Sequence, residues 1–178
     1  MQRLKDAICV MGLDIRTKII GLSRRYETNK EWGSILKRHV RTSLHKHLQR
    51  IATLIGVNIH IIDMPYTAET GSGRGGGQNL IVTEKTFHAE NSERNIYCLI
   101  DEIDGTWNAT CGLIFSCSTM IAFTSITTTK PEDLTLAHFP YGFIIPYYGE
   151  GIYISELHHP PQIMLWDGAL LSLHLSPV

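Results

Sequence analysis

The residues best suited to chemistry are two aspartates, Asp101 and Asp104, that stand three positions apart. Two carboxylates held close together repel each other unless a cation lies between them, and their hard oxygen atoms suit magnesium, calcium or manganese better than zinc. Gly105 follows at once and lets the backbone turn sharply, while Thr106 and Asn108 can donate side-chain hydrogen bonds.

Backbone amides after Gly105 could face an anion, so this stretch has the parts of a metal-bridged phosphate site. Asp-Gly is also a common turn pair. The residues alone therefore fit a β-turn with two solvated acids equally well.

The aspartates come directly after an apolar, uncharged run at residues 96–100. A short apolar run that is rich in β-branched residues and bounded by polar ones predicts a buried strand. Such a strand would deliver Asp101 and Asp104 to the edge of a sheet, which is where a site would need them.

Two amphipathic helices are predicted before this strand. Apolar residues recur every three or four positions from Leu4 to Leu22, and a second such stripe runs through residues 34–55. Gly56 and Asn58 suit the end of the second helix. Strands are then predicted at residues 59–62 and 80–83, with a glycine-rich loop at 64–79 between them.

Charge is distributed unevenly although the net charge is only −1, because most lysines and arginines lie in residues 1–50 and most acids follow. The basic residues of the second helix mostly face away from its apolar stripe, as on a solvated helix face. No aromatic stacking residues are interleaved with them, so nucleic acid is not the expected partner.

Length and composition indicate an ordinary globular domain. The chain has 178 residues, of which 43% are hydrophobic and 19% charged. It contains no apolar run of membrane-spanning length and no apolar secretion segment at residues 1–6, so a cytoplasmic protein without a membrane partner is expected. The four cysteines are few and irregularly spaced, which favours reduced thiols.

The stretch Asp101-Glu102-Ile103-Asp104-Gly105-Thr106 resembles the Asp-Pro-Ile/Leu-Asp-Gly-Thr/Ser signature of the inositol monophosphatase and fructose-1,6-bisphosphatase superfamily. Asn108 also matches, since that motif usually continues Thr-x-Asn. Residues 141–145 and 149–153 are similar to the next strand pair of the archaeal-type members. The resemblance covers residues 35–155, which correspond to the N-terminal part of the family's fold.

The resemblance implies an α+β fold with two N-terminal helices packed on a mostly antiparallel sheet, and a Mg²⁺-dependent phosphomonoesterase. It places Mg²⁺ among Glu84, Asp101, Asp104 and the Ile103 carbonyl. Glu84, Asp101, Asp104 and Thr106 would be catalytic, and Gly105, Thr106 and Asn108 would hold the phosphate. The expected partner is a small phosphorylated polyol or sugar, of the inositol monophosphate or fructose bisphosphate type.

The family's third carboxylate has two candidates here. Glu84 ends a predicted strand 17 residues before Asp101, a spacing that suits the family, although Lys85 stands where a second Glu is usual. Alternatively, the order of helix, Gly56-Val57-Asn58 and strand would place Asp63 at the site. Spacing and side-chain length favour Glu84.

Two departures from the family favour a second interpretation. Glu102 replaces the motif's proline, and family members are longer, with a second α/β layer. The composition also shifts after Glu156, which suggests a domain at residues 1–156 followed by an atypical tail at 157–178. The alternative function is a truncated, inactive member that serves as a binding or oligomerisation domain. Exposed sheet surface would then favour a homodimer.

Overall fold

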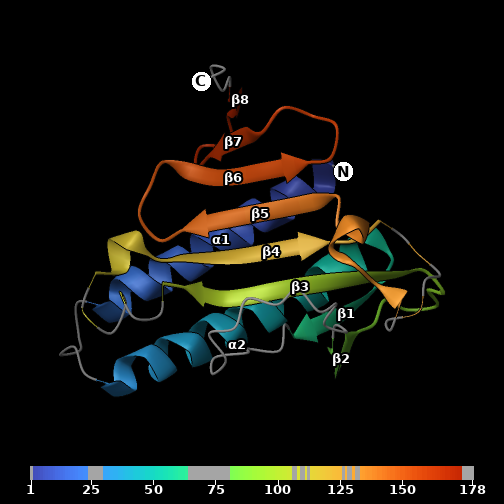
Figure 1. The fold of residues 1–178 in the computed structure, drawn as a ribbon, viewed down its shortest axis with the longest axis horizontal. Coiled ribbons are helices and arrows are strands. Elements are labelled where there is room, and N and C mark those ends of the chain that lie inside the picture. The colour runs from blue at the N-terminus through green and yellow to red at the C-terminus, as the bar shows by residue number, and fades with distance from the viewer. Residues whose placement is uncertain are drawn as a thin grey trace, which may run out of the picture.

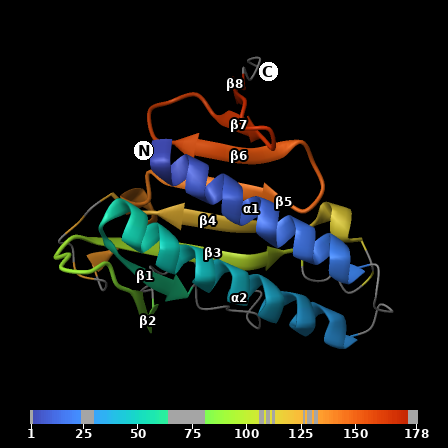
Figure 2. The same cartoon turned by 180° about the vertical axis from the view of Figure 1, so that it is seen from behind.

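Two long helices lie side by side across one face of a single sheet in the computed structural model of the chain (Figures 1 and 2). The structure describes residues 2–23, 30–63, 81–105, 113–125 and 133–173, together with Asn108, Cys111, Thr127 and Lys130. The expected α+β arrangement of two helices on a mostly antiparallel sheet is therefore confirmed.

The helices follow the predicted apolar stripes. Helix α1 spans Gln2–Ser23, and its residues Ile8, Met11, Ile15 and Ile19 are completely buried. Helix α2 spans Lys30–Ile55 and begins one turn before the predicted start. It begins earlier because Trp32, which is also buried, extends the stripe by a further turn.

The sheet has eight strands in the order β2-β1-β3-β4-β5-β6-β7-β8. Only β1 and β3 pair in parallel, and all other neighbours are antiparallel. The strands are β1 (Asn58–Asp63), β2 (Ile81–Phe87), β3 (Asn95–Asp104), β4 (Ser118–Phe123), β5 (Tyr141–Pro146), β6 (Gly151–Glu156), β7 (Gln162–Leu165) and β8 (Leu170–Ser172).

The sheet continues past the predicted domain boundary at Glu156. Strand β7 pairs with β6, and β8 pairs with β7, so residues 162–172 extend the same sheet. A side chain from α1 reaches this part, since Lys5 Nζ lies 3.2 Å from Glu156 Oε2 and 3.0 Å from Gln162 Oε1.

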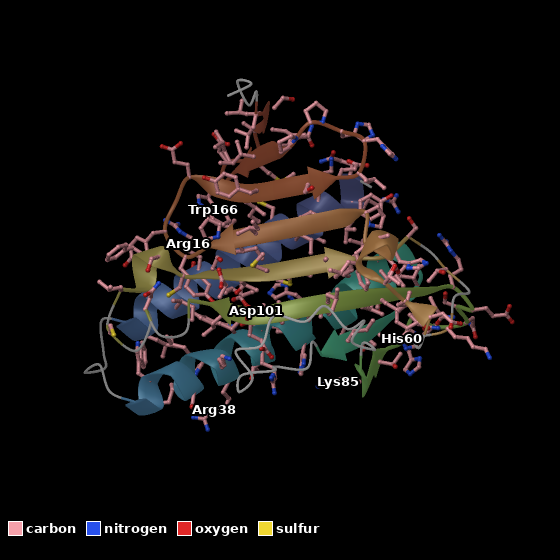
Figure 3. All side chains as sticks on the ribbon, in the orientation of Figure 1. Arg16, Arg38, His60, Lys85, Asp101 and Trp166 are labelled. Carbon is pink, nitrogen blue, oxygen red and sulfur yellow. The ribbon has the colours of Figure 1, made fainter. Side chains whose placement is uncertain are left out.

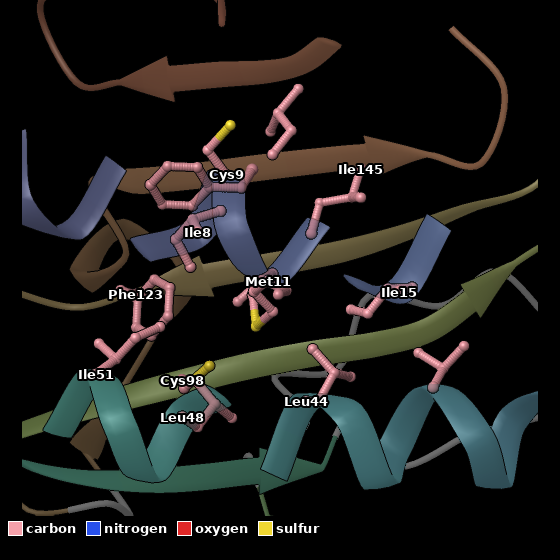
Figure 4. Packing of buried hydrophobic residues seen from close by; sticks show 14 of the residues in the cluster. Ile8, Cys9, Met11, Ile15, Leu44, Leu48, Ile51, Cys98, Phe123 and Ile145 are labelled. Atoms are coloured by element: carbon pink, nitrogen blue, oxygen red, sulfur yellow. The ribbon is translucent and has the colours of Figure 1, made fainter. Parts of the chain in front are cut away.

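The core lies between the helices and one face of the sheet (Figure 4). Alternate residues of the central strands point into it, including Cys98 of β3, Phe123 of β4 and Ile145 of β5. No α-helix covers the other face of the described sheet. The segment around a short 3-10 helix, η3 (Leu136–His138), packs on part of it through Leu134, which is buried with Tyr97 and Leu99. Met120, Ile144 and Tyr153 are exposed on this face, which is called the uncovered face below. Within the residues described, no helix is long and apolar enough to cross a membrane.

The four cysteines form no disulfide, as expected. Cys9, Cys98 and Cys117 are buried, whereas Cys111 is exposed. Burial raises the pKa of the Cys98 thiol well above its ordinary value, so this side chain is a neutral part of the core.

A partly buried polar cluster links the two helices. His47 Nε2 lies 3.1 Å from Asp14 Oδ2, and Lys18 Nζ lies 2.8 Å from the same oxygen and 2.6 Å from Ser43 Oγ. Burial lowers the pKa of His47 and outweighs the hydrogen bond and charge of Asp14, which act to raise it. Partial burial acts to raise the pKa of Asp14, but hydrogen bonds from Lys18, His47 and Ser43 together lower it.

Stability should therefore fall as the pH drops below the ordinary histidine pKa of 6.5. The unfolded chain binds a proton at His47 more readily than the folded chain, so the contribution of this residue is complete above that pH and is lost on acidification. In urea unfolding at about pH 7.5 and about pH 5.5, His47→Gln should lose less stability between the two values than the wild type.

Gln49→Ala, at an exposed position of the same helix, removes a side chain that does not titrate, so it is the control and should keep the wild-type dependence. A pH dependence that is the same in His47→Gln and in the wild type would contradict this assignment.

Candidate active site

The two motif aspartates lie on the same face of the sheet because β3 contains a bulge. Asp101 pairs with Met120 of β4, and Asp104 pairs with Ser118, so three steps along β3 correspond to two along β4. In a regular strand, residues three apart point to opposite faces. The extra residue in β3 restores the alternation of side chains, so both aspartates share the uncovered face with Ser118 and Met120. Figure 3 labels Asp101 at this position.

This geometry corrects one expectation. The motif was predicted to leave the strand after residue 100, but β3 continues to Asp104. Strand pairing with β4 continues on both sides of the bulge, so the aspartates occupy ladder positions of the sheet and do not lie in a solvated β-turn.

Two buried hydroxyl groups hold the bulge through the backbone carbonyl of Glu102. Thr119 Oγ1 donates to Glu102 O at 2.8 Å, and Tyr147 Oη donates to the same oxygen at 2.9 Å. The two hydroxyl oxygens lie 3.0 Å apart, and both residues are 0% exposed. Burial raises the pKa of Tyr147, so its hydroxyl remains a proton donor at neutral pH.

The side chain of Glu102 points to the helix layer, opposite to the aspartates. Its Oε1 accepts a hydrogen bond of 2.6 Å from Nε of Arg41 on α2. The replacement of the motif's proline by Glu102 therefore adds an ion pair that ties β3 to α2. The pair is weak in itself, because the Arg41 side chain is 54% exposed.

The surroundings of Asp101 make its carboxylate harder to ionise, since its pKa is raised. Partial loss of hydration raises the pKa of Asp101, and the nearby charge of Asp104 raises it further. The backbone N–H of Ile103, 3.2 Å from Asp101 Oδ1, and the charge of Lys37 act in the opposite direction. A cation between the carboxylates would relieve this repulsion.

Gly105 ends the strand in a conformation that needs glycine. Its φ is +81°, and a Cβ there would lie 3.1 Å from Ser116 O. The thiol of Cys117 donates to Gly105 O at 3.2 Å. Asn108 begins the next turn, since its carbonyl accepts from the amides of Cys111 and Leu113 at 3.1 and 2.8 Å. Thr106 lies outside the described residues.

The order of the strands distinguishes the two candidates for the third carboxylate. Asp63 ends β1 and pairs directly with Ile100, the residue before Asp101, and the two parallel strands end at the same edge. Glu84 lies in β2, which is one strand farther away, within an irregular stretch between Val82 and Thr86. Only the backbone of Asp63 and of Glu84 is described, and it brings Asp63, but not Glu84, next to the motif strand.

Lys85 stands where the family usually has a second Glu, and its side chain lies on the helix side of the sheet. Its Nζ donates to Nδ1 of His45 on α2 at 2.7 Å. Lys85, His45, Arg41 and Glu102 line a small cavity of about 150 Å³ between α2 and the sheet. The cationic side chains of Lys85 and Arg41 therefore lie on the opposite face from Asp101.

The donor set fits a hard cation in kind, because Asp101 and Asp104 offer carboxylate oxygens on one face. Among the described residues, no group of three or more His, Cys, Asp or Glu side chains forms a metal site. A complete cation site therefore needs a ligand from a further residue, such as the upstream carboxylate.

Sequence reasoning missed Thr119, Tyr147 and Arg41, although all three fix the motif strand. Thr119 could have been found, because it alternates with Ile121 and Phe123 on the buried face of β4 and is the only polar member of that set. Tyr147 and Arg41 come from distant segments, and no local pattern links them to Glu102.

Comparison with solved structures shows a shared fold. The extragenic suppressor protein SuhB from Bartonella henselae aligns with a TM-score of 0.53 and 12% identity, over 89% of this chain and 50% of that one. Fructose-1,6-bisphosphatase from Leishmania major aligns with a TM-score of 0.59 and 12% identity, over 96% and 51%. The chain thus spans about half the length of these structures. No protein-family model and no curated protein sequence matches it.

Replacement of Gly105 by alanine should destabilise the fold. An L-residue in a left-handed conformation costs about 1–2 kcal/mol, and the new Cβ would meet Ser116 O at 3.1 Å. Denaturant unfolding of Gly105→Ala should show a loss of at least that size.

The matched control is Gly21→Ala in α1, where an added Cβ meets nothing within 4 Å. This variant should gain up to about 1 kcal/mol from helix propensity. A Gly105→Ala protein as stable as the wild type would show that the turn after Asp104 is not fixed as described.

Proposed function

We propose that the chain is a Mg²⁺-dependent phosphomonoesterase that acts on a small phosphorylated polyol or sugar, of the inositol monophosphate or fructose bisphosphate type. The observation that carries the proposal is the bulge in β3, which puts Asp101 and Asp104 on one face at the end of the motif strand. The fold shared with a fructose-1,6-bisphosphatase supports the same activity class.

In this proposal Asp101, Asp104 and the Ile103 carbonyl hold Mg²⁺ together with one upstream carboxylate. The bound cation would supply Lewis-acid activation of water and neutralise charge on the phosphate and the leaving alkoxide. Gly105, Thr106 and Asn108 would hold the phosphate oxygens, and Thr106 would also assist the attacking water. Gly105 suits this role because its missing side chain lets the backbone approach a ligand closely.

The pairing of strands supports Asp63 as the upstream carboxylate in place of Glu84, which sequence spacing favoured. Asp63 lies on the strand adjacent to β3, and its partner Ile100 directly precedes Asp101. Parallel neighbours end at the same edge of a sheet, so their terminal side chains can share a ligand.

The second candidate function is an inactive member of the same fold that acts as a binding or oligomerisation domain. One observation favours it: among the described residues, the carboxylates do not by themselves complete a metal site.

A homodimer is proposed for either function, because an apolar row crosses the uncovered face of the sheet. Strand pairing aligns Met120, Ile144, Tyr153, Ile163 and Leu171 in one line that starts beside Asp101. Met120, Ile144 and Tyr153 of this row line a groove of about 510 Å³, in which Asp101 is the one charged residue among the described lining residues. Two copies could therefore bury this surface against each other with little charge repulsion.

Cation binding tests the proposed enzyme. Titration calorimetry of the purified chain should detect Mg²⁺ binding, and the Asp101→Asn/Asp104→Asn variant should lose it by at least about 100-fold, since groups that merely orient metal ligands are already worth 10–100-fold. The same samples should release phosphate from inositol monophosphate or fructose bisphosphate only with both aspartates present.

Asp167→Asn is the matched control, because this aspartate lies in the turn between β7 and β8. Asp63→Asn should weaken Mg²⁺ binding more than Glu84→Gln if the strand order selects the upstream ligand. Binding without phosphate release would support the inactive-domain alternative, and no binding would overturn the metal site.

The dimer is tested by sedimentation velocity over a range of concentrations. Tyr153→Lys places a charge in the centre of the apolar row and should convert the wild-type dimer to a monomer. Tyr148→Lys is the matched control, because Tyr148 is equally exposed (46% against 44%) but lies in the turn after β5. A wild-type chain that is monomeric at every concentration would contradict the proposal.

A further inference from the structure

We propose that Thr119 and Tyr147 are positioning residues for the cation site, because their hydroxyl groups hold the bulge that places both aspartates on one face. This inference rests on the proposed function, since it concerns the affinity of the same site for Mg²⁺. Neither residue would contact the cation or the substrate; both act through the backbone of Glu102.

The bulge creates a need for hydrogen-bond donors. The extra residue of a bulge loses its place in the ladder between two strands. A buried backbone carbonyl that lacks a partner costs free energy. Here the missing ladder donor is replaced from two other places: Thr119 stands on β4 between the two residues that pair with the aspartates, and Tyr147 directly follows β5.

The two hydroxyl groups supply two hydrogens for three contacts. Each hydroxyl has one hydrogen to donate, and three contacts of 2.8, 2.9 and 3.0 Å connect them with Glu102 O and with each other. Removal of either hydroxyl therefore leaves one donor on the carbonyl. Removal of both leaves the Glu102 carbonyl without either donor, so the two deletions should be strongly non-additive.

Tyr147 is itself anchored from both sides. Its backbone N–H donates to Cys117 O at 3.1 Å, and its carbonyl accepts from Arg16 Nε of α1 at 3.2 Å. The Arg16 guanidinium lies 5.3 Å from the centre of the Trp166 ring, and Figure 3 shows the two side chains side by side. The hydroxyl of Tyr147 is thus presented to β3 by contacts that do not involve the carboxylates.

Loss of both hydroxyl groups removes the hydrogen bonds to Glu102 O that stabilise the bulge relative to regular strand pairing. In a regular register, Asp101 and Asp104 would point to opposite faces, and a cation could use only one of them. The apparent affinity for a ligand falls by the fraction of molecules that keep the competent conformation. The readout of the positioning role is therefore Mg²⁺ affinity, separate from overall stability.

The experiment compares Thr119→Val, Tyr147→Phe and the double variant with the wild type by Mg²⁺ calorimetry and thermal unfolding. Each single variant should weaken Mg²⁺ binding by about threefold. The double variant should weaken it by more than the product of the single effects, by about 30-fold or more. Thr119→Ser keeps the hydroxyl and should retain wild-type affinity.

Thr124→Val is the matched control for the loss of a buried threonine hydroxyl. Thr124 is 3% exposed, and its Oγ1 accepts from the backbone N–H of Tyr97 at 2.9 Å, away from the bulge. This variant should lower the unfolding temperature as much as Thr119→Val does, while its Mg²⁺ affinity stays at the wild-type value.

The inference is overturned if Thr119→Val and Tyr147→Phe bind Mg²⁺ as tightly as the wild type, or if Thr124→Val weakens binding equally. The single variants decide the matter even where the double variant does not fold. A wild-type chain that binds no Mg²⁺ overturns the proposed function and this inference together, whereas tight binding in all variants overturns the inference alone.

Discussion

The hydrogen bonds to the Glu102 carbonyl are the interaction on which the candidate site depends. Without them, a strand that ends in Asp-Glu-Ile-Asp would alternate its side chains regularly, and its two aspartates would be separated by the thickness of the sheet. The buried hydroxyls of Thr119 and Tyr147 stabilise an irregular backbone that brings both carboxylates to one surface. The charge of Asp104 opposes the ionisation of Asp101 in this arrangement, and a cation between the two carboxylates would relieve that repulsion.

The helix layer supports the same strand from the other side. Arg41 of α2 holds the Glu102 side chain, while Arg16 of α1 holds the Tyr147 carbonyl. The apolar stripes of both helices press on the central strands, so the sheet cannot shift without loss of packing in the core. One residue of the motif, Glu102, therefore connects the sheet, the helix layer and the aspartates.

Much of this fold could be predicted from local patterns. The apolar stripes predicted both helices, and the uncharged run before Asp101 predicted the central strand. The bulge could not be predicted, because it depends on hydroxyl groups 17 and 45 residues away in the sequence. Sequence reasoning favoured Glu84 over Asp63 as the upstream carboxylate, and it could not take the arrangement of the strands into account. Spacing along the chain says nothing of strand order, and β2 follows β1 in sequence but lies at the outer edge of the sheet.

The anchoring of Tyr147 by α1 has a consequence for the order of events during synthesis. Arg16 and Tyr147 are separated by 131 residues, and Lys5 and Gln162 by 157. Helix α1 is synthesised well before its two partners, Tyr147 after β5 and Gln162 on β7. The motif strand is complete long before Tyr147 exists, so a nascent chain that ends before β5 carries both aspartates without the contact that aligns them. The two carboxylates are therefore aligned only after the segment that contains Tyr147 has been made and has packed against α1.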